Sequence, residues 1–203
     1  GSPPPHGPQP PAGPPASPGG EPTTPTGDLE ALDFSPYLRW RCEHFLGFKL
    51  LRLDLRAFVD FPALYPEPLR LVLGPAGCGK TALVGAIALE LDDEAPPVDG
   101  IPALHLNMVA HHVCSRTYVD WRSPRRFVAN LSLALCARLP AYNLHLSART
   151  RQWLHKANAD PANGIAAIHA CLKKVTADDL AEAGIPHGQR AFILVDRWTS
   201  RST

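Results

Sequence analysis

The sequence predicts an α/β fold in which a parallel sheet is flanked by helices. Three short apolar runs, at 69–73, 103–114 and 190–196, have the composition of buried strands. The stretches between them repeat apolar residues at helical spacing. Parallel strands need long crossover connections, which are usually helices, so this order of elements favours a parallel sheet.

Residues 1–27 are expected to form a disordered tail rich in proline and glycine. They hold 11 of the 23 prolines, and they contain no aromatic residue and no Leu, Ile or Val. Such a segment cannot bury enough apolar surface to offset its ordering entropy. We interpret it as a spacer, with docking of SH3-like partners as the alternative. From the Gly-Ser start and the single methionine, Met108, we expect either an excerpt of a longer protein or a start left by cloning.

Residues 28–68 are expected to be a helical lead-in followed by a linker. Leu46, Leu50 and Leu53 fall on one helical face, which predicts an amphipathic helix over 41–58. The stretch "FPALYPEP" at 61–68 contains three prolines and predicts a connection.

The next elements are predicted to be a strand at 69–73 and a helix at 81–91. The strand sequence "LRLVL" is short, apolar and bounded by Pro68 and Gly74, which is typical of a strand buried on both faces. The Ala- and Leu-rich run from Thr81 favours a helix, and "DDEAPPVDGIP" at 92–102 ends it.

The second half is predicted to contain a strand, two helices and a final strand. The strands are the later part of 103–114 and the run 190–196. Ser123-Pro124 and Asp160-Pro161 each supply a side-chain cap and a proline for the first helical turn. The helix over 124–139 has an apolar stripe of Phe127, Leu131, Leu135 and Leu139. The helix from 160 has an apolar stripe of Ile165, Ile168, Leu172 and Val175.

A glycine-rich stretch lies between the predicted strand at 69–73 and the helix that follows. It reads Gly74, Pro75, Ala76, Gly77, Cys78, Gly79, Lys80, Thr81 and matches the phosphate-binding loop pattern in full. Its glycines allow positive φ, so that successive amide N–H groups can surround an anion. Lys80 would reach the β- and γ-phosphates of a nucleotide, and Thr81 would give its hydroxyl to Mg²⁺. The motif therefore predicts that residues 74–81 bind nucleotide.

The second part of such a site is an acid at the end of another buried strand. Asp196 closes the apolar run "AFILVD" and is predicted to meet the Mg²⁺ held by Thr81. The residues after it, "RWTSRST", contain no carboxylate that could position an attacking water. Magnesium binding is thus predicted at Thr81 and Asp196, while no catalytic residue is identified.

The composition excludes several classes of partner. Lys plus Arg total 20 and Asp plus Glu total 19, which gives no electrostatic case for nucleic acid or an anionic membrane surface. No apolar run reaches about 18 residues, so we expect no membrane insertion. Five cysteines at wide, irregular spacing favour reduced thiols in a cytoplasmic protein over a disulfide framework or zinc ribbon.

Two further groups could carry chemistry. His111, His112 and Cys114 lie close together on one strand, but adjacent strand residues point to opposite faces, which favours sheet packing over a metal site. Cys78 is interpreted as a small residue that fits the turn, with a redox-sensitive thiol as the alternative.

Five segments of the chain, taken with their order, resemble those of a known family. They are "LVLGPAGCGKTALV" (71–84), "MVAHHVC" (108–114), "PRRFVANLSLALC" (124–136), "DPANGIAAIHACLKKV" (160–175) and "IPHGQRAFILVD" (185–196). Together they resemble the STAND-class, NACHT-like P-loop NTPase domains of ankyrin- and tetratricopeptide-repeat scaffold proteins such as the TANC family. The resemblance implies a P-loop NTPase domain over 69–203 that is incomplete at the C-terminus. It implies ATP and Mg²⁺ as ligands, with Lys80 and Thr81 on nucleotide and Asp196 on magnesium. It also implies a cytoplasmic scaffold, postsynaptic in the TANC proteins.

Three functions stay open at this point. The first is a nucleotide-binding module of an intracellular signalling scaffold, which acts as a switch or an assembly platform for other signalling proteins. The second is an active ATPase, whose turnover would collapse on Lys80→Ala. The third is a degenerate domain that serves only as an interaction scaffold and gives no thermal shift with magnesium ATP.

Overall fold

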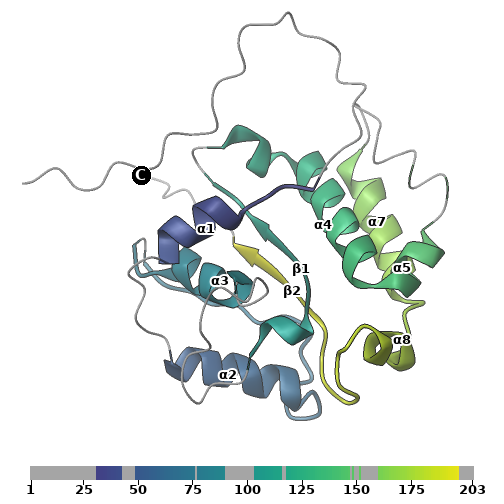
Figure 1. The fold of residues 1–203 in the computed structure, drawn as a ribbon, viewed down its shortest axis with the longest axis horizontal. Helices are drawn as coiled ribbons and strands as arrows, with labels where there is room; N and C mark the ends of the chain where they lie inside the picture. Colours follow the sequence, from purple (N-terminus) through teal and green to yellow (C-terminus); the bar gives the residue numbers. More distant parts are fainter. Residues whose placement is uncertain are drawn as a thin grey trace, which may run out of the picture.

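The structure is a computed structural model that describes residues 31–42, 49–75, 77–89, 103–115, 118–146, 148, 151 and 160–196. The predicted tail at 1–27 and the predicted break at 92–102 lie outside the described residues. Within them the chain is mixed α/β, with a small parallel sheet and helices on both of its faces (Figure 1). The predicted fold class is confirmed at this level.

The sheet consists of two parallel strands, β1 (Met108–Val113) and β2 (Phe192–Asp196). The register places Met108 opposite Phe192 and Val113 opposite Asp196. Both strands were expected from their apolar runs, and nearly every residue of β1 is buried, as a strand covered on both faces requires. The carboxyl ends of the two strands therefore meet at one end of the sheet.

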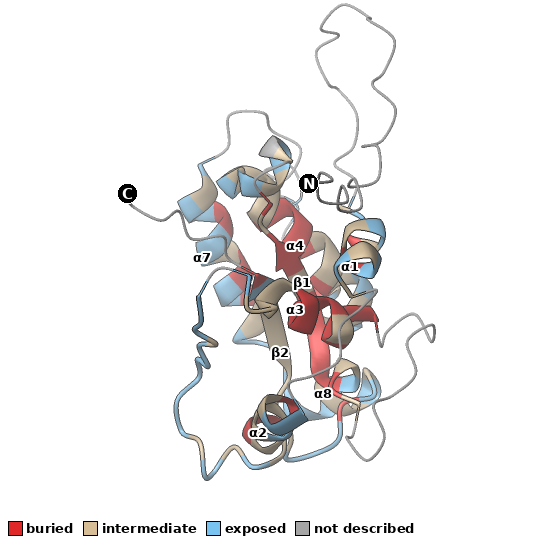
Figure 2. Cartoon of the chain, turned by 90° about the vertical axis from the view of Figure 1, so that its left-hand side faces the viewer, coloured by how far each residue is buried: buried red, intermediate tan, exposed pale blue. Residues whose placement is uncertain are grey.

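Helices form a layer on each side of this sheet (Figure 1). One layer contains α1 (Ser35–Cys42), α2 (Lys49–Asp60) and α3 (Lys80–Ala88). The other contains α4 (Pro124–Arg138), α5 (Pro140–His145), α7 (Pro161–Leu172) and α8 (Ala177–Glu182). A separate apolar core fills the space under each layer. Burial is most complete along α3, β1 and α4 (Figure 2).

The caps that the sequence predicts are present on α4 and α7. The Ser123 hydroxyl accepts a hydrogen bond from the Arg126 amide at 3.4 Å, and the Asp160 carboxylate accepts one from the Ala162 amide at 3.0 Å. The α4 stripe is confirmed, because Leu131, Leu135 and Leu139 are buried and Phe127 is partly buried. The buried stripe predicted for α7 is wrong at Ile165, because this side chain is 43% exposed. Gly164, Ile168 and Cys171 are the buried residues of that helix.

The apolar face predicted for the lead-in helix is also wrong. Within 41–58, the structure has α1 ending at Cys42 and α2 beginning at Lys49, and Leu46 lies outside the described residues. Leu50 is 83% exposed, whereas Leu55 and Phe58 pack against the core. The predicted face with Leu50 and the face with Leu55 and Phe58 both have helical spacing. The buried face is the one that carries the aromatic ring of Phe58.

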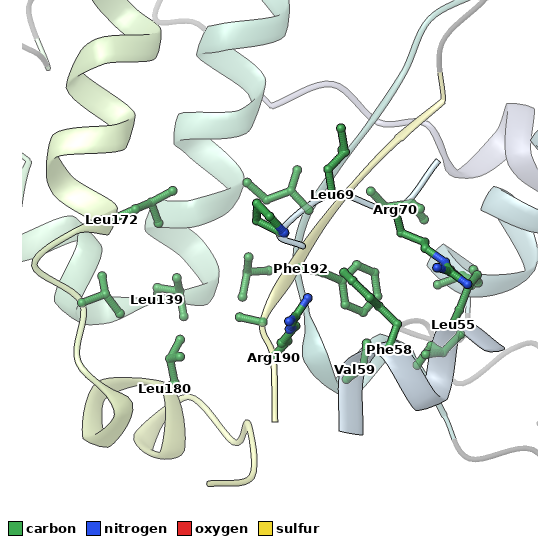
Figure 3. Close-up of a pocket in the computed structure, with 18 of the residues that line it drawn as sticks. Leu55, Phe58, Val59, Leu69, Arg70, Leu139, Leu172, Leu180, Arg190 and Phe192 are labelled. Atoms are coloured by element: carbon green, nitrogen blue, oxygen red, sulfur yellow. The ribbon is translucent and has the colours of Figure 1, made fainter. Parts of the chain in front are cut away.

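The strand predicted at 69–73 is not formed. Leu69, Leu71 and Leu73 are 67%, 68% and 86% exposed, and the stretch that joins α2 to α3 runs along the outside of the molecule (Figure 2). An apolar run becomes a strand only when a neighbouring strand satisfies its backbone groups. Here a cavity of about 630 Å³ lies between Leu69 and the side of β2 that carries Phe192 (Figure 3).

Candidate functional site

The glycine-rich loop leads directly into α3, as the motif predicts. Gly77 and Gly79 have φ of 80° and 88°, a left-handed conformation that favours glycine, and Lys80 is the first residue of the helix. The Leu83 amide donates to the Gly79 carbonyl at 2.9 Å, which joins the loop to the first helical turn. Ala76 lies outside the described residues. The two glycines thus have the left-handed conformation that the motif predicts for this loop.

Lys80 is hydrogen-bonded to the loop itself. Its ammonium donates to the carbonyl oxygens of Gly74 and Pro75 at 2.7 and 2.8 Å. Its Nζ also lies 3.5 Å from the Cys78 sulfur. The lysine predicted to meet the phosphates is therefore folded over its own loop, and a phosphate would have to replace these carbonyl acceptors.

Thr81 and Asp196 are brought into contact by the fold. Thr81 lies in the first turn of α3, and Asp196 is the last residue of β2 and only 9% exposed. The Thr81 side chain lies close enough to the Asp196 carboxyl for its hydrogen bonding to lower the pKa of that group. These are the two residues predicted to hold magnesium, and hydroxyl and carboxylate oxygens are ligands that Mg²⁺ accepts. The residues present fit such an ion.

Opposing effects act on the pKa of the Asp196 carboxyl. Burial raises the pKa of its carboxyl, while the Thr81 hydrogen bond and the charges of Lys80 and Arg41 act in the opposite direction. A buried carboxylate is costly to ionise without compensation, so a bound cation would stabilise its charged form.

Arg41 is a site residue that sequence reasoning missed. It lies in the last turn of α1, and its charge acts on Asp196. The position of α1 depends on its close packing against α3, which requires Gly85. A Cβ at position 85 would lie 2.4 Å from the Cys42 sulfur and 3.2 Å from the Leu38 carbonyl oxygen. The glycine in the middle of α3 is the one sequence signal for this approach.

The histidine cluster is part of the packing around β1. His112 is fully buried, its Nε2 lies 2.9 Å from the Trp121 carbonyl oxygen, and its ring packs edge-on against Phe34 and Phe127. Burial lowers its pKa. Within the described ranges, no three His, Cys, Asp or Glu side chains come together as a metal cage. A magnesium ion typically needs only one or two protein carboxylates, because water and phosphate supply the rest.

The cavity beside β2 does not have the character of an anion site. Most of its lining is apolar, and its two arginines are already engaged (Figure 3). The Arg190 guanidinium donates to the Pro62, Tyr65 and Glu67 carbonyls, and Arg70 pairs with Asp54. The polar groups suited to a nucleotide therefore lie at the loop and the end of β2.

Comparisons with known proteins identify no relative of this chain. No family model, curated protein or solved structure matches the chain. No helix in the part of the chain that the structure describes is long and apolar enough to cross a membrane. Any functional conclusion consequently depends on the site itself.

Proposed function

We propose that the chain is a nucleotide-binding module that holds magnesium ATP at residues 74–81, within a P-loop NTPase domain of the STAND class. The observation that carries the proposal is the contact between the Thr81 hydroxyl and the Asp196 carboxyl. The two residues belong to separate sequence signals, one a glycine-rich loop and the other an acid that ends an apolar strand. Their meeting supports a common function for both signals.

Each residue has a distinct task in this proposal. The loop amides around Gly77 and Gly79 surround the phosphates, and the Lys80 ammonium neutralises them. Thr81 and Asp196 would hold Mg²⁺, which when bound spreads charge over the β- and γ-phosphate oxygens. The burial of Asp196 keeps competing water away from this carboxyl.

For the biological setting, the proposal rests on the resemblance of the sequence segments alone. We place the module in a cytoplasmic signalling scaffold, at the postsynaptic density, where it acts as a switch or an assembly platform for other scaffold and signalling proteins. A ligand that binds only one arrangement of the loop shifts the population toward that arrangement. In this proposal the arrangement in which Lys80 is hydrogen-bonded to its own loop is the nucleotide-free one, and an arrangement opened onto phosphate is the nucleotide-bound one.

A thermal-shift experiment tests the proposal. Magnesium ATP at about 100 times its dissociation constant stabilises a protein by about 2.7 kcal/mol, which raises the melting temperature of a chain of this size by about 5–10 °C. Lys80→Ala should remove the shift, and so should a chelator of divalent cations. Lys174→Ala is the matched control, since Lys174 is exposed in the turn that follows α7, and it should keep the shift.

The absence of any shift with magnesium ATP or magnesium GTP in the unmodified chain would overturn the proposal and favour a pure interaction scaffold. A shift that persists in Lys80→Ala would place the nucleotide elsewhere. Phosphate release, measured on the same samples, separates a binding module from an ATPase.

A further inference from the structure

The outer edge of β2 carries backbone groups that face away from the sheet. The Cys114 amide donates to the Asp196 carbonyl at 2.9 Å, so Asp196 directs its carbonyl toward β1. Successive residues of a strand direct their backbone groups to alternate edges, which turns those of Ile193 and Val195 away from β1. In the described part of the chain, no third strand pairs with this edge. An open edge of this kind is a template for another strand.

The walls of the cavity beside β2 suit an apolar strand. Residues 191–194 form one wall, and Leu69 and Arg70 belong to the opposite wall. Each helical layer contributes apolar side chains to the remaining walls (Figure 3). Because the side chains of a strand alternate between two faces, a strand in the cavity would contact both layers. The contributors include Leu55, Phe58, Leu139, Leu172 and Leu180.

The stretch on the opposite wall, which we call the leucine run (residues 69–73), is tied at both ends. Before the run, the Arg190 guanidinium donates to the Glu67 carbonyl at 2.7 Å. After the run, the Lys80 ammonium donates to the Gly74 carbonyl at 2.7 Å. The run therefore lies across the cavity from β2, and the cavity between them is left for a segment of another molecule.

The leucine run has the pattern of a strand that lacks a partner. Its three leucines, at alternate positions, are 67%, 68% and 86% exposed, whereas Val72 packs against the core. This alternation has the period of a strand. The other two runs of strand-like composition, 103–114 and 190–196, already supply β1 and β2. The chain thus offers an open strand edge together with an exposed run that could pair with such an edge.

We propose that two copies of this chain associate by exchanging their leucine runs, each of which enters the cavity of the other copy and pairs with β2. A two-fold axis between the two runs gives the strand order β1, β2, partner run, own run, partner β2, partner β1. The same surface thereby serves as donor and acceptor in both copies, and the exposed leucines of each run become buried.

The direction of the strands is compatible with this exchange. The leucine run leads from the side of Arg190, before β2, toward α3, whose Thr81 lies beside Asp196 at the end of β2. It is therefore parallel to β2. Two-fold symmetry makes the partner run antiparallel to both, and antiparallel pairing is slightly the more stable kind. No nucleotide is required, so the inference does not depend on the proposed function.

Sedimentation velocity of the full chain without nucleotide tests the proposal. From about 5 to 200 µM, a range that populates dimers of micromolar affinity, we expect a shift from monomer to dimer. Leu71→Asp should weaken association about tenfold or more, because a carboxylate is costly to bury in an apolar cavity. Leu71 is exposed in the single chain, so this variant should keep its fold, which circular dichroism checks. Leu50→Asp is the matched control, since Leu50 is 83% exposed on α2 and does not line the cavity; it should leave the dimer unchanged.

Hydrogen exchange of peptides that contain residues 69–73 and 192–196 locates the contact. Their amides should become more protected as the protein concentration rises. A chain that stays monomeric over the whole range overturns the proposal, and so does a dimer that Leu71→Asp leaves intact or that Leu50→Asp weakens equally. Protection that is independent of concentration would show instead that the run closes onto β2 of its own chain. The thermal shift with magnesium ATP is a separate readout, so either proposal can fail without the other.

Discussion

The contact between α1 and α3 gives the sharpest prediction about the folded state. In Gly85→Ala, the new methyl group would lie 2.4 Å from the Cys42 sulfur and 3.2 Å from the Leu38 carbonyl oxygen. The sulfur can move by a side-chain rotation, but the carbonyl belongs to the backbone of α1. The substitution therefore pushes the two helices apart unless the thiol gives way.

The expected magnitudes follow from opposing effects. Alanine is favoured over glycine inside a helix by about 1 kcal/mol, and overpacking a tight contact costs about 1–3 kcal/mol, so Gly85→Ala should lose about 1 kcal/mol of unfolding free energy. Cys42→Ala loses the hydrogen bond to Ala82 and some packing, also about 1 kcal/mol. In the double variant the methyl group occupies the space left by the sulfur. Its total loss should be about 1 kcal/mol rather than 2, a coupling of about 1 kcal/mol.

Urea denaturation of the four proteins, followed by circular dichroism, measures these free energies. The control pair is Gly85→Ala with Cys171→Ala, because Cys171 is buried in the core on the other side of the sheet and should add independently. Additive losses for Gly85→Ala and Cys42→Ala, within about 0.5 kcal/mol, would show that the two helices do not meet as described.

Three further predictions concern the site, the core and the segment before the loop. Burial raises the pKa of Asp196 in the folded state, so the free energy of unfolding should fall as pH rises above the usual carboxyl range. In thermal melts between about pH 4 and 7, Asp196→Asn should abolish this fall. The same variant should also lose the thermal shift with magnesium ATP. Leu135→Ala should cost about 2–5 kcal/mol in urea denaturation, because Leu135 is fully buried. Leu71→Ser should cost less than about 0.5 kcal/mol, and a larger loss would indicate a buried strand.

Local chemistry was the most predictable part of the fold. Helix α4 follows from a serine cap, a proline in the first turn and an unbroken apolar stripe, all within one short stretch. Strand β2 follows from an apolar run long enough for a strand and too short for a helix. In both cases the signal lies in the residues of the element itself.

The predictions failed where a distant neighbour decides the outcome. The run 69–73 has a composition suited to burial, but composition does not specify a pairing partner, and the stretch lies beside β2 without forming a strand. In α2, Leu50 and Leu55 belong to two different apolar faces, and both faces have helical spacing. Only the position of α3 and the core determines which face is buried.

The candidate site shows the same division. Thr81 and Asp196 could be predicted to meet, because a loop motif and an acid at a strand end have a known relation in parallel sheets. Arg41 could not be predicted, because its place depends on how α1 docks onto α3 through Gly85. Residues that act at a site through packing between helices leave no contiguous pattern in the sequence.

The two carbonyls that receive the Lys80 ammonium have a consequence for kinetics. In the proposed site they act as a built-in competitor of the nucleotide, so the measured dissociation constant equals the intrinsic one divided by the fraction of loops that are open. If opening precedes binding, the association rate observed in a rapid-mixing experiment should level off at high nucleotide concentration, at the rate of opening. The protein would then ignore brief rises in nucleotide and respond only to sustained ones.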